Sequence, residues 1–249
     1  MSQLKTGARR VQAVDHAVQI LDCFLGGEQT LGLREIAAEL NLNKSSVYRL
    51  LETLVVGGLL AKDPFSRGYT LGIKLVQLAQ RLGTRFALTE TAMPLLQRLR
   101  DETGETAALH VRIAAQRLCV AQLPSSQPVR MMLEMDRPYP LVHGAAGKVF
   151  LAYLPSASIH ALLAELSPEA GEALEHELPT IRQEGYAISR GEVIADTTSI
   201  CAAVLSRTGE PAAALGIHGP AYRIPKAAIP GLAKQVLDVA ADLGRLLPP

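Results

Sequence analysis

The stretch NKSSVYRLLETL, residues 43–54, combines two kinds of surface in one short segment. Four apolar residues recur at the i, i+3, i+4 and i+7 positions that line one face of a helix: Val47, Leu50, Leu51 and Leu54. Hydroxyl, amide and cationic side chains gather at the N-terminal end, where the dipole of a helix disfavours positive charge. Such a helix either presents its cationic end to a partner or carries an ordinary solvated face.

The residues before this segment predict two further helices. Apolar stripes at helical spacing run through residues 14–25, up to a pair of glycines, and through residues 33–40. Asn41 tolerates the left-handed backbone of a sharp turn, and Asn43 is a suitable N-cap for the next helix. Two helices joined by a turn of about three residues have the spacing of a helix-turn-helix unit.

A hairpin is expected after the third helix. The runs LLAK (59–62) and YTL (69–71) flank the turn sequence DPFSRG (63–68), an order typical of two short antiparallel strands. Together with the three helices, this hairpin predicts a winged helix-turn-helix over about residues 11–71. We therefore expect a first domain at residues 1–71, which includes a basic N-terminal arm.

Residues 72–84 predict an amphipathic linker helix. Its apolar residues Ile73, Val76 and Ala79 have no partner within the small first domain. A copy of the same helix in a second subunit would cover them. We therefore expect a homodimer or a tetramer.

The remaining residues, 85–249, alternate between helical and strand patterns. Helices are expected at 88–103, 147–153, 156–166, 178–185 and 226–246, and strands at 107–113, 118–123, 128–133, 200–206 and 212–218. Strands grouped at both ends, with helices between them, predict an α+β domain with a largely antiparallel sheet.

Composition and charge restrict the class of protein. The chain has 249 residues, of which 48% are hydrophobic, so two domains with cores of their own are expected. The net charge is +3 over residues 1–84 and −2 over residues 85–249, which favours a polyanion as partner of the first part. The three cysteines lack metal-ligand spacing, and no apolar run approaches a membrane span. We expect a cytoplasmic protein without a metal, a cofactor or a membrane partner.

The cationic end of the 43–54 segment predicts contacts with double-stranded DNA. A recognition helix presents its N-terminal residues to base edges in the major groove, while hydroxyl and cationic side chains bind phosphates. The expected DNA-binding residues are Arg9 and Arg10 of the arm, Arg34, Lys44, Ser45, Ser46, Tyr48 and Arg49, and Arg67 of the wing turn.

Two sets of motifs resemble one known family. The runs LREIAAELNLNKSSVYRLLETL (33–54), GLLAKDP (58–64) and RGYTLG (67–72) resemble the DNA-binding half of the IclR family of bacterial transcription regulators. The runs PLVHGAAGK (140–148), GYAISRGE (185–192) and ICAAV (200–204) resemble its second half. The resemblance covers nearly the whole chain in the right order, and it implies that residues 85–249 form a GAF-like effector-binding domain.

The resemblance also implies a pocket for a small metabolite, an organic or aromatic acid, that modulates binding to a DNA operator. Carried over position by position, the pocket residues are Met131, Tyr139, Ala145, Ala146, Ser189, Thr197 and Ser199. Small residues at 145 and 146 would bring backbone N–H groups to the start of a helix, where a carboxylate is stabilised. Because Tyr139, Ser189 and Ser199 depart from the residues common in the family, the identity of the ligand does not carry over.

Two other functions fit parts of the sequence: a metabolic enzyme built on the α+β domain, and a GAF-type sensor that does not bind DNA. The run GAAGK (144–148) lacks the spacing of a phosphate-binding loop. No nucleophile motif surrounds His143, Asp196 or Cys201, so no catalytic residue is predicted. Glu192 is expected to be a surface acid or an ion-pair partner rather than a pocket wall.

Overall fold

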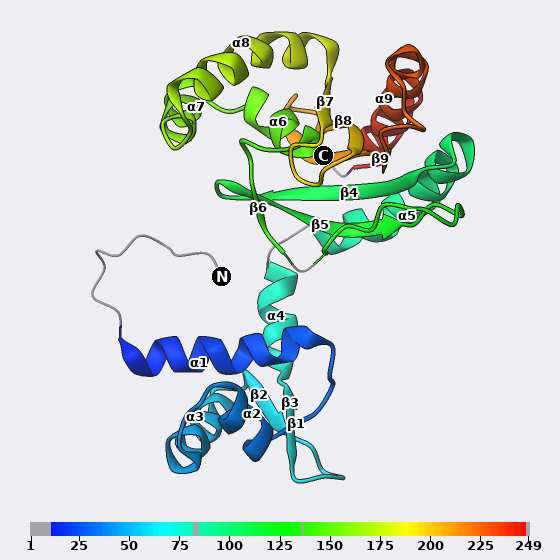
Figure 1. Ribbon diagram of the computed structural model, residues 1–249. Coiled ribbons are helices and arrows are strands. Elements are labelled where there is room, and N and C mark those ends of the chain that lie inside the picture. Colours follow the sequence, from blue (N-terminus) through cyan, green and yellow to red (C-terminus); the bar gives the residue numbers. More distant parts are fainter. Residues whose placement is uncertain (1–10, 82–84, 136, 248–249) are drawn as a thin grey trace. The chain divides into compact units, whose positions relative to one another are not determined.

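The computed structural model describes residues 11–81, 85–135 and 137–247 (Figure 1). The chain forms two compact units, residues 1–83 and 84–249. Among the described helices, none is both long and apolar enough to cross a lipid bilayer. Arg9 and Arg10 of the expected basic arm, and residues 82–84 at the end of the expected linker helix, lie outside the described residues.

The N-terminal unit is the predicted winged helix-turn-helix, followed by a further helix (Figure 1). Its elements are α1 (Gln12–Asp22), a 3₁₀ turn (Cys23–Gly26), β1 (Leu31–Gly32), α2 (Leu33–Glu39), α3 (Lys44–Val56), β2 (Leu60–Lys62), β3 (Gly68–Leu71) and α4 (Ile73–Arg81). The three strands form an antiparallel sheet in the order β1-β3-β2, in which the hairpin of β2 and β3 is the wing.

The turn between α2 and α3 has the geometry that its two asparagines predict. Asn41 adopts the left-handed conformation with φ of 52°, which an asparagine reaches at little cost. The Asn43 side-chain oxygen accepts hydrogen bonds from the Ser46 backbone N–H and the Ser45 hydroxyl, both at 2.8 Å. Asn43 therefore caps α3 and satisfies one of the backbone donors that begin a helix without partners.

The apolar face of α3 lies in the core of this unit. Val47 and Leu51 have no exposed surface, and Leu54 retains only 7%. They pack with Ile20 of α1 and Ile36 of α2, which are also fully buried. Because these side chains fix the rotation of α3 about its axis, the residues on its other faces are held at the surface.

The C-terminal unit is an α+β domain around one antiparallel sheet (Figure 1). Its helices are α5 (Arg85–Thr103), α6 (Ala145–Ala152), α7 (Ser156–Leu163), α8 (Pro168–Glu184) and α9 (Ile229–Leu246), the last preceded by a 3₁₀ turn (Lys226–Ala228). Its strands are β4 (Thr106–Ile113), β5 (Gln116–Leu123), β6 (Tyr139–Pro140), β7 (Tyr186–Arg190), β8 (Thr197–Leu205) and β9 (Pro211–Pro220). The strand order is β6-β5-β4-β9-β8-β7.

The two faces of this sheet have different neighbours. Helices α5 and α9 pack on one face, whereas α6, with α7 and α8 beyond it, covers the other. Successive residues of a strand point to opposite faces, so Ile200 joins the core beneath α5 and α9 while Cys201 joins the core beneath α6. On β4, Leu109 joins the core beneath α5 and α9, so the next residue, His110, points to the α6 side.

The prediction of a strand at 128–133 is wrong, because this segment has no strand partner. Side chains satisfy its backbone instead. The Gln122 amide donates to the Leu133 carbonyl at 2.8 Å and accepts from its N–H at 3.0 Å. Thr106 donates to the Met131 carbonyl, and Arg223 donates to the Val129 carbonyl, each at 2.7 Å. The two-residue strand β6 is the edge of the sheet on this side.

The helix predicted at 178–185 begins ten residues earlier, and the strand after it was not predicted. Ser167 caps α8 by accepting the Ala170 N–H at 3.3 Å, and the exposed Pro179 is accommodated inside the helix. Gly185 ends α8 in the left-handed conformation with φ of 79°. The chain then enters β7 directly, so the GYAISRGE motif is mostly strand.

Replacing Asn43 with alanine should lower the free energy of unfolding by about 1 kcal/mol, because the N-cap hydrogen bond to α3 is lost. Urea denaturation followed by circular dichroism measures the change. Asn43→Ser keeps a capping oxygen and is the matched control. Equal stability of the alanine and serine variants would contradict the capping role.

Candidate nucleic-acid interface and effector cavity

The N-terminal end of α3 presents polar and cationic side chains to solvent. Lys44, Ser45 and Arg49 are exposed, and 48% of the Tyr48 surface is accessible. Ser46 is half-buried, and its backbone N–H donates to the Asn43 cap. These are the residue types that bind phosphates and base edges. The capped helix holds their side chains on the same solvent-exposed end of α3.

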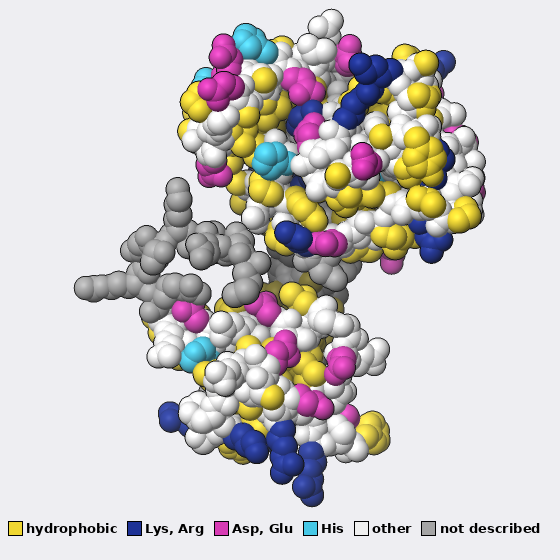
Figure 2. Space-filling model, in the orientation of Figure 1, with side chains coloured by type: hydrophobic (Ala, Val, Ile, Leu, Met, Phe, Trp, Pro, Cys, Tyr) yellow, Lys and Arg dark blue, Asp and Glu magenta, His cyan; other side chains and the backbone are white. Residues whose placement is uncertain are grey.

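The cations of this surface have no internal partners among the described residues. Arg34, Lys44, Arg49 and Arg67 form no ion pair with any acid in the described part of the chain. The acid on α3, Glu52, is instead neutralised by Lys62 of β2 at 2.8 Å. Figure 2 shows Lys and Arg side chains along the lower edge of this unit, where Figure 1 places α3 and the wing. The unpaired cations are available to phosphate groups.

The wing adds a cation and an aromatic ring. Asp63 accepts hydrogen bonds from the Phe65 N–H at 3.0 Å and the Ser66 hydroxyl at 2.6 Å, which lower the pKa of Asp63 and fix the turn. Arg67 is exposed as predicted, and Phe65 is 96% exposed. Phe65 was not among the residues predicted to contact DNA. Its position in a Pro-containing turn was the available signal, and an apolar ring at such a tip can insert between base steps.

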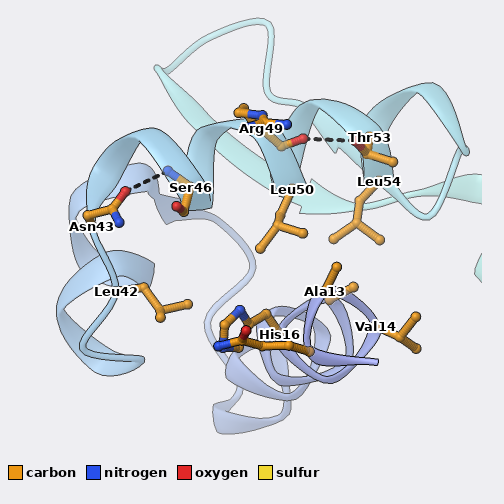
Figure 3. Close-up of a pocket in the computed structure, with 12 residues that line it drawn as sticks. Ala13, Val14, His16, Leu42, Asn43, Ser46, Arg49, Leu50, Thr53 and Leu54 are labelled. Carbon is orange, nitrogen blue, oxygen red and sulfur yellow. Dashed lines mark hydrogen bonds between the residues drawn. The ribbon is translucent and has the colours of Figure 1, made fainter. Parts of the chain in front are cut away.

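An open groove of about 700 Å³ lies between α1 and α3 (Figure 3). Leu50 and Leu54 of α3 point toward Ala13 and Val14 of α1. The groove is wide and shallow, and it lies outside the unit in which the effector pocket is expected. The groove is the gap between two helices of the N-terminal unit, so it is not the candidate effector site.

The predicted pocket residues lie on the α6 side of the C-terminal sheet or in the loops beside it. Ser189 and Ser199 are directly paired across β7 and β8, so they share one face. Ala145 and Ala146 are buried at the start of α6. Thr197 donates its hydroxyl to the Ile194 carbonyl at 2.6 Å, and Met131 is half-buried in the 128–133 segment.

A small cavity of about 20 Å³ opens beside this face. Of the predicted pocket residues, only Tyr139 lines it; the other lining residues are His110, Arg117, Cys119, Leu133, Glu134, Val193 and Ile194. The cavity has room for about one water molecule. A larger molecule therefore requires the loops that carry Leu133 and Val193 to move apart.

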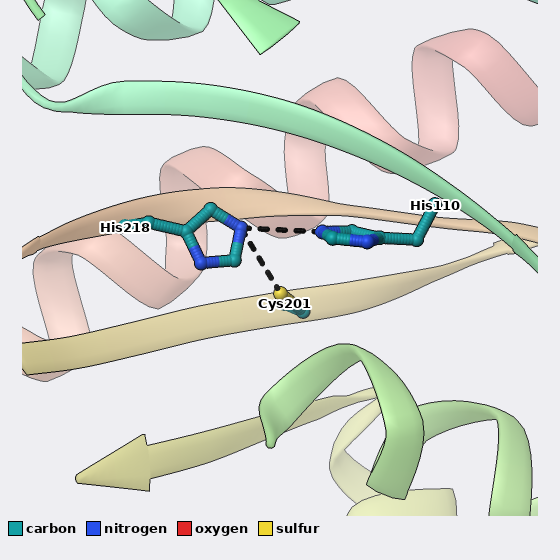
Figure 4. Close-up of side chains that lie close together, drawn as sticks. All are labelled: His110, Cys201 and His218. Carbon is teal, nitrogen blue, oxygen red and sulfur yellow. Dashed lines mark hydrogen bonds between the residues drawn. The ribbon is translucent and has the colours of Figure 1, made fainter. Parts of the chain in front are cut away.

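A buried polar cluster extends inward from this cavity (Figure 4). The Nε2 atoms of His110 and His218 lie 3.4 Å apart, and the Cys201 sulfur lies 3.9 Å from His218 Nε2. His218 Nδ1 is 2.8 Å from the Ser199 hydroxyl. His110 follows Leu109 on β4, and His218 follows Ile217 on β9. Because successive strand residues point to opposite faces, this alternation is the sequence signal that could have placed both histidines on the α6 face.

Burial keeps this cluster uncharged. Burial and the nearby charge of Arg117 lower the pKa of His218 to about 3. Burial, His218 and Arg117 together lower the pKa of His110 well below its usual value. The ligand atoms of His110, Cys201 and His218 lie within 4.8 Å of one another, a set that suits a soft divalent ion. Burial raises the pKa of the Cys201 thiol to about 12, which disfavours the thiolate that such an ion requires.

The start of α6 already holds an internal carboxylate. Glu192 accepts the Gly144 N–H at 2.9 Å and pairs with Lys148 at 2.9 Å. Lys148 is buried and also binds Glu177 at 3.0 Å. Glu192 is thus an ion-pair partner, as expected from the sequence, and it binds the backbone N–H of the N-cap residue Gly144, directly before Ala145 and Ala146.

Comparison with known proteins agrees with this architecture. The model of the IclR helix-turn-helix domain matches residues 13–64, and that of the C-terminal region of bacterial IclR transcriptional regulators matches residues 80–245. The glycerol operon regulatory protein of Streptomyces coelicolor is 31% identical over 246 residues, covering 96% of this chain and 97% of that protein.

Solved structures show the same fold. An IclR transcriptional regulator from Alicyclobacillus acidocaldarius has a TM-score of 0.72 at 25% identity, covering 95% of this chain and 98% of its own. An IclR homologue from Microbacterium hydrocarbonoxydans, complexed with 4-hydroxybenzoate, has a TM-score of 0.76 at 21% identity, covering 94% and 98%. The chain therefore belongs to the IclR family of bacterial transcriptional regulators, with a helix-turn-helix DNA-binding domain and a C-terminal effector-binding domain.

Proposed function

We propose that this regulator binds a DNA operator through α3 and the wing, and that an organic or aromatic acid bound in the C-terminal unit changes its operator affinity. The observation that carries the proposal is the outward, unpaired cationic tip of α3, whose leucines are locked in the core. In this role Arg49 binds guanine or phosphate, and Tyr48 and Ser45 bind the backbone. The full proposed interface is Arg9, Arg10, Arg34, Lys44, Ser45, Ser46, Tyr48, Arg49 and Arg67.

The choice of an acid as effector has two supports. The Microbacterium homologue was crystallised with 4-hydroxybenzoate, an aromatic acid. In this chain the cavity wall combines the positively charged Arg117 with apolar Leu133, Val193 and Ile194. The proposed pocket joins these residues to the family-derived set of Met131, Tyr139, Ala145, Ala146, Ser189, Thr197 and Ser199.

Transmission to DNA requires at least two arrangements that the effector binds with different affinity. The exposed apolar residues of α4 supply a surface for pairing with a second copy: Ile73 is 69% exposed, and Val76 and Leu78 are each 51% exposed. We propose a homodimer or tetramer in which effector binding biases the pairing of these helices. A symmetric dimer then reads two half-sites of one operator.

The alternatives explain less of the structure. An enzyme with a cysteine nucleophile needs a lowered thiol pKa, whereas burial raises the pKa of Cys119 and of Cys201 to about 12 each. A sensor that does not bind DNA leaves the unpaired cations of α3 without a role. Duplex binding that weakens as salt rises separates such a sensor from a DNA-binding regulator.

Replacing Arg49 with alanine should weaken specific DNA binding by about 1 to 3 kcal/mol, the value of one bidentate base contact. Gel shift with a duplex that the wild-type protein selects from a random pool measures the change. Arg190→Ala removes an exposed arginine from β7 and is the control. An unchanged midpoint for Arg49→Ala would remove Arg49 from the interface.

Replacing Ser189 or Ser199 with alanine should reduce the thermal stabilisation given by an effector acid, since each removes a hydroxyl on the pocket face, while operator affinity without effector stays nearly unchanged. A ligand at about 100 times its dissociation constant stabilises by about 2.7 kcal/mol, so the loss is measurable by thermal shift. Ser158→Ala, on the exposed surface of α7, is the control. If neither pocket variant alters the response, the pocket lies elsewhere.

A further inference from the structure

Arg117, near the start of β5, is a buried guanidinium that has no ion-pair partner among the described residues. Only 6% of its surface is exposed, and its Nε has no hydrogen-bond partner. Within the described part of the chain, it forms neither an ion pair nor a hydrogen bond. The guanidinium lies over the ring of Tyr139, whose centroid is 5.1 Å from the guanidinium carbon.

A charge in this position is costly to the folded protein. Burial lowers the pKa of Arg117 from its ordinary value, but arginine remains protonated in proteins. A buried charge is normally paired, because an unpaired one loses its hydration without a compensating partner. An apolar residue of similar size would fill the same space without this cost, so the positive charge calls for a partner from outside the chain.

Two acids of the described residues near this cavity are engaged elsewhere. Glu192 is held by the Gly144 N–H and by Lys148; its charge acts on Arg117 and raises the pKa of that guanidinium against the larger lowering by burial, but the two form no ion pair. Glu134 lines the same cavity, but its carboxylate binds the Tyr139 hydroxyl at 3.2 Å and Arg137 at 3.1 Å.

The guanidinium is aimed at the cavity and at the beginning of α6. A Cβ atom on Gly144 would fall 2.8 Å from Arg117 Nη2, so the guanidinium lies directly against the backbone before α6; the φ of 76° at Gly144 favours glycine there. The remaining walls near Arg117 differ in character. Val193 and Ile194 are apolar, whereas His110 leads to the uncharged chain of His218 and Ser199.

We propose that Arg117 is the anion anchor of the effector cavity, and that the ligand is a small monocarboxylic acid. Its carboxylate pairs with Arg117, and its apolar body lies against Val193 and Ile194. This inference rests on the proposed function as an acid-responsive regulator, and it adds the residue that recognises the acid. Because the ligand charge is met by Arg117, Glu192 can keep its hydrogen bond from the Gly144 N–H and its ion pair with Lys148.

The test compares acids with their neutral isosteres. Acetate, benzoate and 4-hydroxybenzoate are titrated into the full-length protein against acetamide, benzamide and 4-hydroxybenzamide, at constant ionic strength, with thermal shift and calorimetry as readouts. The wild-type protein should bind at least one acid about 10- to 100-fold more tightly than its amide, as expected for a charge-assisted hydrogen-bonded pair. In Arg117→Gln this ratio should fall to about one.

Three further variants separate recognition from structural support. Arg117→Met keeps much of the side-chain volume and should also lose the preference for the acid, which keeps the test valid if the glutamine variant does not fold. Arg117→Lys restores the charge and should restore part of the preference. Arg137→Gln is the matched control, because Arg137 also stacks on Tyr139, at 5.2 Å, but is exposed and paired with Glu134.

Each other outcome overturns the proposal in a recognisable way. A preference for the acid that persists in folded Arg117→Gln and Arg117→Met would refute the role of Arg117. If the acid still releases the protein from DNA in that case, the proposed function remains valid. Equal binding of acids and amides by the wild-type protein, or binding of none of the six probes, would refute the anion site. Duplex binding by wild type and Arg49→Ala tests the regulator function independently of that result.

Discussion

The N-terminal unit depends on how α3 divides its surface between core and solvent. Val47 and Leu51 are fully buried and Leu54 nearly so, and truncation of such a leucine to alanine costs about 2 to 5 kcal/mol. Side chains three and four residues apart share a helix face, so burying these three fixes the outward direction of Tyr48 and Arg49. The core packing that stabilises the domain is thus the same packing that aims its cationic tip.

Both units retain charges where internal stability alone would not place them. Lys44 is the first residue of α3, at the positive end of the helix dipole. Arg117 lies buried beside the α6 side of the C-terminal sheet, near His110 and His218 on strands that are otherwise largely apolar. Local violations of this kind are typical of functional sites, where binding of a partner compensates for the cost. The partner that we propose for Lys44 is a phosphate, and the partner that we propose for Arg117 is a carboxylate.

The sequence predicted those parts of the structure that depend on local chemistry. Asn41 and Asn43 were assigned to the turn and the cap from their side chains alone, and the wing followed from its turn residues. The strand expected at 128–133 was wrong, because its β-like pattern says nothing of the Gln122 amide that holds Leu133 from the preceding strand, β5.

The surroundings of the candidate effector site followed less completely from the sequence than the winged helix-turn-helix did. Of the residues named from the family pattern, Ser189 and Ser199 share one face of the sheet, and Tyr139 lines the cavity. The pattern did not show that Glu192 binds the Gly144 N–H before α6 or that Arg117 is buried. An arginine near the start of a strand usually lies in solvent, and its burial follows only from long-range packing against the segment before α6.

The most direct test of the account is the salt dependence of duplex binding by the wild-type protein. Recognition through the cationic tip of α3 releases counterions from DNA, so the logarithm of the binding constant should fall linearly with the logarithm of salt concentration. With Lys44, Arg49 and Arg67 each neutralising one phosphate, the slope should be about −2.7 per subunit or steeper. Binding that is undetectable at low salt, or that does not change as salt rises, would contradict DNA recognition by this surface.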